Sequence, residues 1–115
     1  MNTVRSLGKT VGNKFYYTNE KDNSFVTKIV TEPIYITTNE NLILIKNIEK
    51  CELFLDSLKT THIIVKSLTD VVIKPTSNLI DEFFTEIEIG RGACVEFFNL
   101  DGNWYIISSD GLKLD

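Results

Sequence analysis

Short runs of β-branched and aromatic residues recur along most of the chain and are typical of strands. Only two prolines and six glycines interrupt them. No segment keeps the 3.6-residue period of an amphipathic helix for more than a turn or two. The pattern therefore predicts an all-β protein. The predicted strands span residues 25–29, 34–37, 42–48, 51–55, 62–66, 71–74, 83–89, 93–99 and 104–108.

The segment from residue 78 to residue 92 is the least regular part of this pattern. A short helical turn fits residues 78–84, but the alternation of residues from Phe84 to Ile89 favours a strand. The following Gly90-Arg91-Gly92 is interpreted as a turn, because its two glycines separate one apolar run from the next. We therefore expect two separate strands on either side of it.

The strongest local signal is a hairpin in the segment VEFFNLDGNWYIIS. Asp101-Gly102 supplies the two positive-φ positions of a type I′ turn between two strand-like runs. A two-residue loop pairs Leu100 with Asn103, Asn99 with Trp104, Phe98 with Tyr105, and Phe97 with Ile106.

This pairing divides the hairpin residues between two faces, and both faces are apolar. One face carries Phe97, Trp104 and Ile106, and the other carries Phe98, Leu100, Tyr105 and Ile107. Among these residues, Phe97, Phe98, Trp104, Tyr105 and Ile107 are the candidate packing or oligomer anchors.

Continuous apolar runs also occur at residues 42–45, 63–65 and 71–73. An antiparallel sheet with one solvated face would alternate apolar with polar residues instead. A domain of this size has too little chain to cover every strand twice, so we expect self-association to cover the second face. The alternative is a small monomeric sandwich whose strand ends carry extra apolar residues.

The first 24 residues differ from the rest of the chain. They are polar, are interrupted by Gly8 and Gly12, and carry an aromatic cluster at Phe15, Tyr16 and Tyr17. This composition predicts an N-terminal arm at residues 1–24 that attaches to a partner through the aromatic cluster, ahead of a β-sandwich domain at residues 25–115. An additional edge strand of the same domain remains the alternative.

Length and charge limit the classes of function. With 115 residues the chain holds one domain. Its pI near 5.0 and the absence of any Lys/Arg cluster in the sequence argue against nucleic-acid binding. Residues 1–30 carry five basic and two acidic side chains, whereas residues 81–115 carry two basic and eight acidic ones. No apolar run is long enough to span a bilayer and the start lacks a secretory signal, so we expect no membrane partner and no export.

The residues that carry chemistry form no recognisable catalytic or metal-binding set. Cys51 and Cys94 lack CxxC spacing and are interpreted as buried free thiols, with a disulfide only if their strands are adjacent. The single histidine, His62, has no catalytic partner in its motif, and Glu86 and Glu88 lie side by side toward solvent. Phosphate-binding and calcium-binding loops are also missing. We therefore expect no enzyme activity, no metal and no cofactor.

From about residue 39 to residue 111 the order of features resembles a module of bacteriophage virion proteins, particularly fibres and head-decoration proteins. The matching motifs are IIVK at residues 63–66, VVIKP at residues 71–75 and FFNLDGNWYIISSDG at residues 97–111. The Asn-Trp-Tyr element at residues 103–105 is the most specific of them. Phe83 and Phe84 depart from the module, which often has a small turn at this place.

The resemblance implies a small antiparallel β-sandwich that trimerises and acts as a structural, non-catalytic part of a virion. We therefore expect a capsid decoration or head-fibre component, or a tail-fibre or baseplate part. Made in the host cytoplasm, it would be located in the virion and bind the major capsid protein or a fibre protein. The alternative function is a carbohydrate- or ligand-binding β-sandwich that uses Tyr16, Tyr17 and Tyr105 as a stacking platform.

Overall fold

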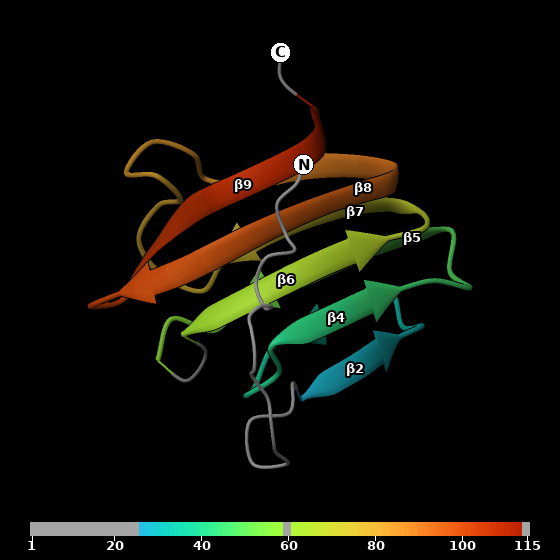
Figure 1. Cartoon of the computed structure of the whole chain (residues 1–115), viewed down its shortest axis with the longest axis horizontal. Helices are drawn as coiled ribbons and strands as arrows, with labels where there is room; N and C mark the ends of the chain where they lie inside the picture. The colour runs from blue at the N-terminus through green and yellow to red at the C-terminus, as the bar shows by residue number, and fades with distance from the viewer. Residues whose placement is uncertain (1–25, 59–60, 114–115) are drawn as a thin grey trace, which may run out of the picture.

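The computed structural model describes residues 26–58 and 61–113, and this part of the chain is all-β (Figure 1). It contains no helix, and therefore none that is long and apolar enough to cross a membrane. The strands are β2 (Thr27–Val30), β3 (Ile34–Ile36), β4 (Leu42–Ile45), β5 (Lys50–Leu55), β6 (His62–Ser67), β7 (Asp70–Pro75), β8 (Ile87–Leu100) and β9 (Asn103–Lys113).

The eight strands form one sheet in the order β2-β4-β6-β8-β7-β5-β3, with β9 added beside β8. Strands β2, β4 and β6 are parallel neighbours, and so are β3, β5 and β7. The sheet therefore has two halves, β2-β4-β6 and β3-β5-β7. From β2 to β7 the chain alternates between them, and each new strand is added beside the previous strand of its own half. The long strand β8 joins the halves, because residues 94–98 pair with β6 and residues 87–89 pair with β7. The sheet curls until it is nearly barrel-shaped, and β2 and β3 are the first and last strands of this order (Figure 1).

The expected antiparallel pairing is wrong for strands β2 to β7. Thr27 pairs with Leu42, and Leu42 pairs with Ile64, both in parallel ladders. Parallel neighbours need a long crossover connection, and here a strand of the opposite half supplies it. Among the strands that the structure describes, the antiparallel ladders are the three that β8 forms with β6, β7 and β9. One curled sheet is thus present where two packed antiparallel sheets were expected.

The hydrophobic core fills the inside of the curled sheet. Alternate residues of each strand point inward, as in β5, where Cys51, Leu53 and Leu55 are fully buried and the residues between them are half-buried. The buried hydrophobic side chains are Val30, Ile43, Ile45, Cys51, Leu53, Leu55, Ile63, Val65, Val71, Val72, Ile73, Ile80, Ile87, Ile89, Ala93, Val95, Phe97 and Trp104. Both halves of the sheet contribute to the same core.

Two local predictions between residues 78 and 92 are wrong. Residues 81–83 form a turn between Ile80 and Phe84, and Asp81 and Glu82 both have positive φ, so the predicted strand begins only at Ile87. The Gly90-Arg91-Gly92 segment is not a chain reversal, because it lies inside β8. The register with β9 shifts here, and β8 bends as it passes from β7 to β6.

Candidate interaction surface

The predicted hairpin is confirmed at the β8–β9 connection. Asp101 and Gly102 have φ values of 55° and 86°, as a type I′ turn requires. The four predicted residue pairs all occur in the ladder. The amide N–H of Gly102 donates to Oδ1 of Asn99 at 2.8 Å, and Nδ2 of Asn99 donates to the carbonyl of Ser57 at 2.9 Å. These bonds tie the turn to the β5–β6 loop.

The inner face of the hairpin belongs to the core of the single chain. Phe97 and Trp104 are fully buried and meet edge to face, with ring centroids 6.2 Å apart. Ile106 is partly buried and packs against the core cluster to which both rings belong. Of the predicted anchors, Phe97 and Trp104 therefore lie inside this chain, and their side chains are not accessible to a partner.

The outer face of the hairpin is apolar and open. Phe98 and Tyr105 stack with their ring planes 26° apart and their centroids 5.3 Å apart. Leu100 is 56% exposed, and Ile107 is 51% exposed at the point where the β8–β9 register shifts. We call these four residues, Phe98, Leu100, Tyr105 and Ile107, the hairpin face.

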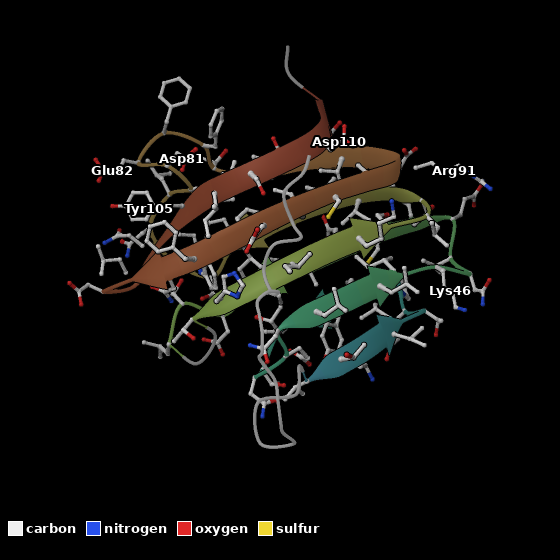
Figure 2. All side chains as sticks on the ribbon, in the orientation of Figure 1. Lys46, Asp81, Glu82, Arg91, Tyr105 and Asp110 are labelled. Atoms are coloured by element: carbon white, nitrogen blue, oxygen red, sulfur yellow. The ribbon has the colours of Figure 1, made fainter. Side chains whose placement is uncertain are left out.

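A turn at residues 78–84 lies against β9 next to the hairpin face, and the sequence reasoning missed it. The hydroxyl of Tyr105 donates to Oε2 of Glu82 at 2.8 Å, and the amide N–H of Ile106 donates to Oδ1 of Asp81 at 2.9 Å. The amide N–H of Asp81 donates to the carbonyl of Trp104 at 2.8 Å. Figure 2 shows the Asp81, Glu82 and Tyr105 side chains close together at the end of the molecule that carries the β8–β9 turn.

This turn presents an aromatic side chain to solvent. Phe83 is 75% exposed, and its ring meets that of Phe84 edge to face, with the ring centroids 4.9 Å apart.

The hydrogen bond to the Glu82 carboxylate raises the pKa of Tyr105, because it stabilises the protonated phenol. The signal in the sequence was the DEFF segment at residues 81–84, in which two acidic residues precede two phenylalanines.

The apolar runs noted in the sequence also reach the outer surface. Leu42 and Ile64 occupy one row across β4 and β6, and Glu96 of β8 continues that row. Both apolar side chains are half-buried, whereas Ile43 and Val65 point into the core. The outer surface of this half of the sheet is therefore a mixture of aliphatic and charged side chains.

The candidate chemical groups are not assembled into a reactive site in the described part of the chain. Both cysteines are free, and they lie on β5 and β8, which are not neighbours. Burial raises the pKa of the Cys51 thiol to about 11, so it stays protonated at neutral pH. Nε2 of His62 lies 2.5 Å from Oε2 of Glu96 on the surface. No group of three His, Cys, Asp or Glu side chains suited to a metal ion occurs among residues 26–58 and 61–113.

No protein-family model matches this chain, and no curated protein is similar to it at a significant level. Functional inference therefore depends on the surface itself. Three of the predicted anchors, Phe98, Tyr105 and Ile107, lie on that surface. The predicted attachment residues Phe15, Tyr16 and Tyr17 lie outside the described residues.

Proposed function

We propose that this protein is a non-catalytic structural component of a bacteriophage virion, of the capsid-decoration or head-fibre type, which forms homotrimers. The observation that carries the proposal is the exposed hairpin face. Its stacked pair, Phe98 and Tyr105, lies on the surface of a hairpin whose opposite face already fills the core. The resemblance of residues 39–111 to a phage virion module supports the same function.

An apolar hairpin face suits a protein contact. Contiguous apolar patches are uncommon on soluble monomers and mark interaction sites where they occur. Aromatic residues are enriched among the residues that contribute most binding energy, because they bury a large area while losing little conformational entropy. Phe98 and Tyr105 are also held rigid by their stacking and by the Tyr105–Glu82 hydrogen bond. Binding would therefore cost little further ordering.

Attachment to the particle is proposed to occur through residues 1–24. This segment carries four basic and two acidic side chains, whereas residues 81–115 are strongly acidic. Phe15, Tyr16 and Tyr17 would bind the major capsid protein or a fibre protein. The hairpin face then serves self-association, and the arm serves attachment.

The mass of the purified protein in solution tests self-association. We expect light scattering at micromolar concentration to give a trimer for the wild type and a smaller mass for the double variant Phe98→Ser/Tyr105→Ser. The matched control is Ile34→Ser, because Ile34 is 58% exposed on β3, away from the hairpin. A wild-type monomer, or loss of mass in the control alone, would contradict the role of this face.

Location in the virion is tested on purified particles. We expect mass spectrometry to find the chain in particles of the phage that encodes it, and electron microscopy to show density that disappears when the chain is deleted. Particles that contain none of this chain would overturn the virion assignment.

The second candidate is a carbohydrate-binding module, favoured by the surface position of the Phe98–Tyr105 pair. A sugar would stack on the open ring faces, and the protein would be a monomer. Screening an oligosaccharide array distinguishes this candidate from the virion protein. Sugar binding by a monomeric wild type that disappears in Tyr105→Ser would support it.

A further inference from the structure

The two ends of the strands differ in charge and shape. At one end, the loops at residues 56–58, 76–86 and 101–102 carry five carboxylates and, among their described residues, no lysine or arginine. Phe83 is the most exposed aromatic side chain of these loops. We call this end the acidic end. In Figure 2, Asp81 and Glu82 lie there, and Lys46 and Arg91 lie at the opposite end of the strands.

The opposite end contains an open hollow of about 510 Å³. The β4–β5 loop, the β6–β7 loop and the bend of β8 form its walls. Ile48 and Leu68 give it apolar surface, and Lys46 and Arg91 give it positive charge. Glu49 is the one carboxylate among its described lining residues. We call this site the basic hollow. Its volume exceeds that of a phenyl ring several times, so an aromatic side chain with its flanking residues fits inside.

We propose that two copies of this chain bind head to tail, with the Phe83 ring of one copy in the basic hollow of the next. The Glu82 carboxylate would then face Lys46 and Arg91, while Phe83 packs on Ile48 and Leu68. This inference rests on the self-association proposed above and adds a second contact, distinct from the hairpin face. Charge complementarity selects a second copy, because this one chain carries both an acidic projection and a positively charged hollow.

The geometry of the turn supports a role in contact. Asp81 and Glu82 both adopt left-handed backbone conformations that side-chain-bearing residues rarely take. Their hydrogen bonds to Ile106 and Tyr105 hold them there. Strained backbone that its surroundings hold in place is typical of functional sites. Here the strained residues hold Phe83 at a fixed point outside the sheet, so its insertion would require little ordering.

The head-to-tail contact joins two different patches of the chain, so the rotation between copies sets the size of the assembly. An interface between two different patches forms a closed ring when the rotation between copies closes, and an open filament when it does not. Each copy uses its acidic end once and its basic hollow once. A ring of three copies therefore leaves neither patch exposed.

Charge reversal and rescue test this contact. Glu82→Lys and Arg91→Glu each place like charges across the interface, so we expect each variant alone to associate at least tenfold more weakly in sedimentation equilibrium. The double variant Glu82→Lys/Arg91→Glu should restore the wild-type mass, because both charges are reversed in every copy and opposite charges then meet at each interface. Arg91 is exposed, so the melting temperature of Arg91→Glu should change little, whereas Glu82→Lys also loses the hydrogen bond from Tyr105 and should melt at a lower temperature. Recovery of the mass in the double variant separates the charge contact from that loss of stability. Glu88→Lys is the charge-matched control, since Glu88 is exposed on β8 and belongs neither to the lining of the basic hollow nor to the loops of the acidic end.

Phe83→Ser tests the apolar part of the same contact. We expect the same weakened association with an unchanged melting temperature. If Glu82→Lys, Arg91→Glu and Phe83→Ser all keep the wild-type mass, the head-to-tail contact is wrong. Loss of mass in Phe98→Ser/Tyr105→Ser alone would then leave the proposed self-association standing. A wild-type monomer would instead overturn both proposals.

Discussion

The indole of Trp104 meets the ring of Phe97 edge to face at the centre of the β8–β9 hairpin, and neither side chain reaches solvent. The carbonyl of Trp104 also accepts a hydrogen bond from the amide N–H of Asp81. One residue thus links the hairpin, the core and the turn that carries Phe83. The stability of the surface turn therefore depends on packing inside the sheet.

Trp104→Ala should lower the free energy of unfolding by about 3–5 kcal/mol, because it removes a fully buried aromatic side chain. Trp104→Phe should cost less, since Nε1 of Trp104 is buried without a hydrogen-bond acceptor among the described residues and its removal offsets part of the lost packing. Urea denaturation followed by circular dichroism measures both. Ile36→Ala is the control, because Ile36 is 53% exposed on β3, away from the hairpin. Equal midpoints for Trp104→Ala and the control would contradict a core role.

The positions of most strands could be predicted from residue type, and the hairpin could be predicted down to its residue pairs. Asp101-Gly102 selects one turn type, and the two-residue loop then leaves a single register for Phe98 and Tyr105. The information is local, so no distant contact was needed. The two apolar faces of the hairpin follow from the same register.

The parallel winding was not predicted, although the continuous apolar runs at residues 42–45, 63–65 and 71–73 lie on β4, β6 and β7, which all have parallel neighbours. Self-association explains such runs equally well, so residue type alone does not distinguish the two. Leu42 and Ile64 are paired although 22 positions separate them, while Thr27 and Leu42 are only 15 apart, so no fixed repeat marks the turns. The turn at residues 78–84 was misread for another reason. Bonds from β9 hold Asp81 and Glu82 in left-handed conformations, and these tertiary contacts override the strand preference of Phe83 and Phe84.

Acid should destabilise the protein through Glu40. Burial by itself would raise the pKa of this carboxyl, but hydrogen bonds from Tyr35 and from the backbone and hydroxyl of Thr38 outweigh burial and lower it below 4.5. A lowered folded-state pKa stabilises the fold above pH 4.5, and this contribution is lost as pH falls through the folded-state value. We expect the urea midpoint of the wild type to fall below about pH 4.5. In Glu40→Gln the fall should be smaller, and an equal fall would contradict the assignment.

Alkali should destabilise the protein through Tyr35. Burial, together with the hydrogen bond to Glu40 and its negative charge, raises the pKa of the phenol from 10.0 to about 12. The unfolded chain therefore loses this proton first, and stability falls as pH rises from about 10 to about 12. Tyr35→Phe should reduce that fall while costing about 1.5–3 kcal/mol at neutral pH, because Glu40 loses a donor. Urea midpoints between pH 7 and pH 11, measured for both proteins, check the slope and the neutral-pH cost.

Two glycines of the hairpin should differ in their tolerance of alanine. Gly92 and Gly111 both have positive φ, so each substitution costs about 1–2 kcal/mol of backbone strain. A Cβ on Gly92 meets nothing within 4 Å, whereas one on Gly111 would lie 2.7 Å from Cβ of Ala93. Gly111→Ala should therefore be clearly more destabilising than Gly92→Ala in urea denaturation. Equal costs would show that β9 shifts away from Ala93 without loss of stability.

Removal of residues 1–24 should leave the β-domain folded but prevent attachment to the particle. Among the described residues, buried hydrophobic side chains of β2 and of β4 to β9 already form one core cluster. We expect an unchanged β-type circular dichroism spectrum and no co-sedimentation with particles that lack the endogenous protein. The full-length triple variant Phe15→Ser/Tyr16→Ser/Tyr17→Ser should also fail to bind if the aromatic cluster makes the contact. Loss of the β signal on truncation would show instead that the segment is part of the sheet, because an attached arm contributes nothing to the core.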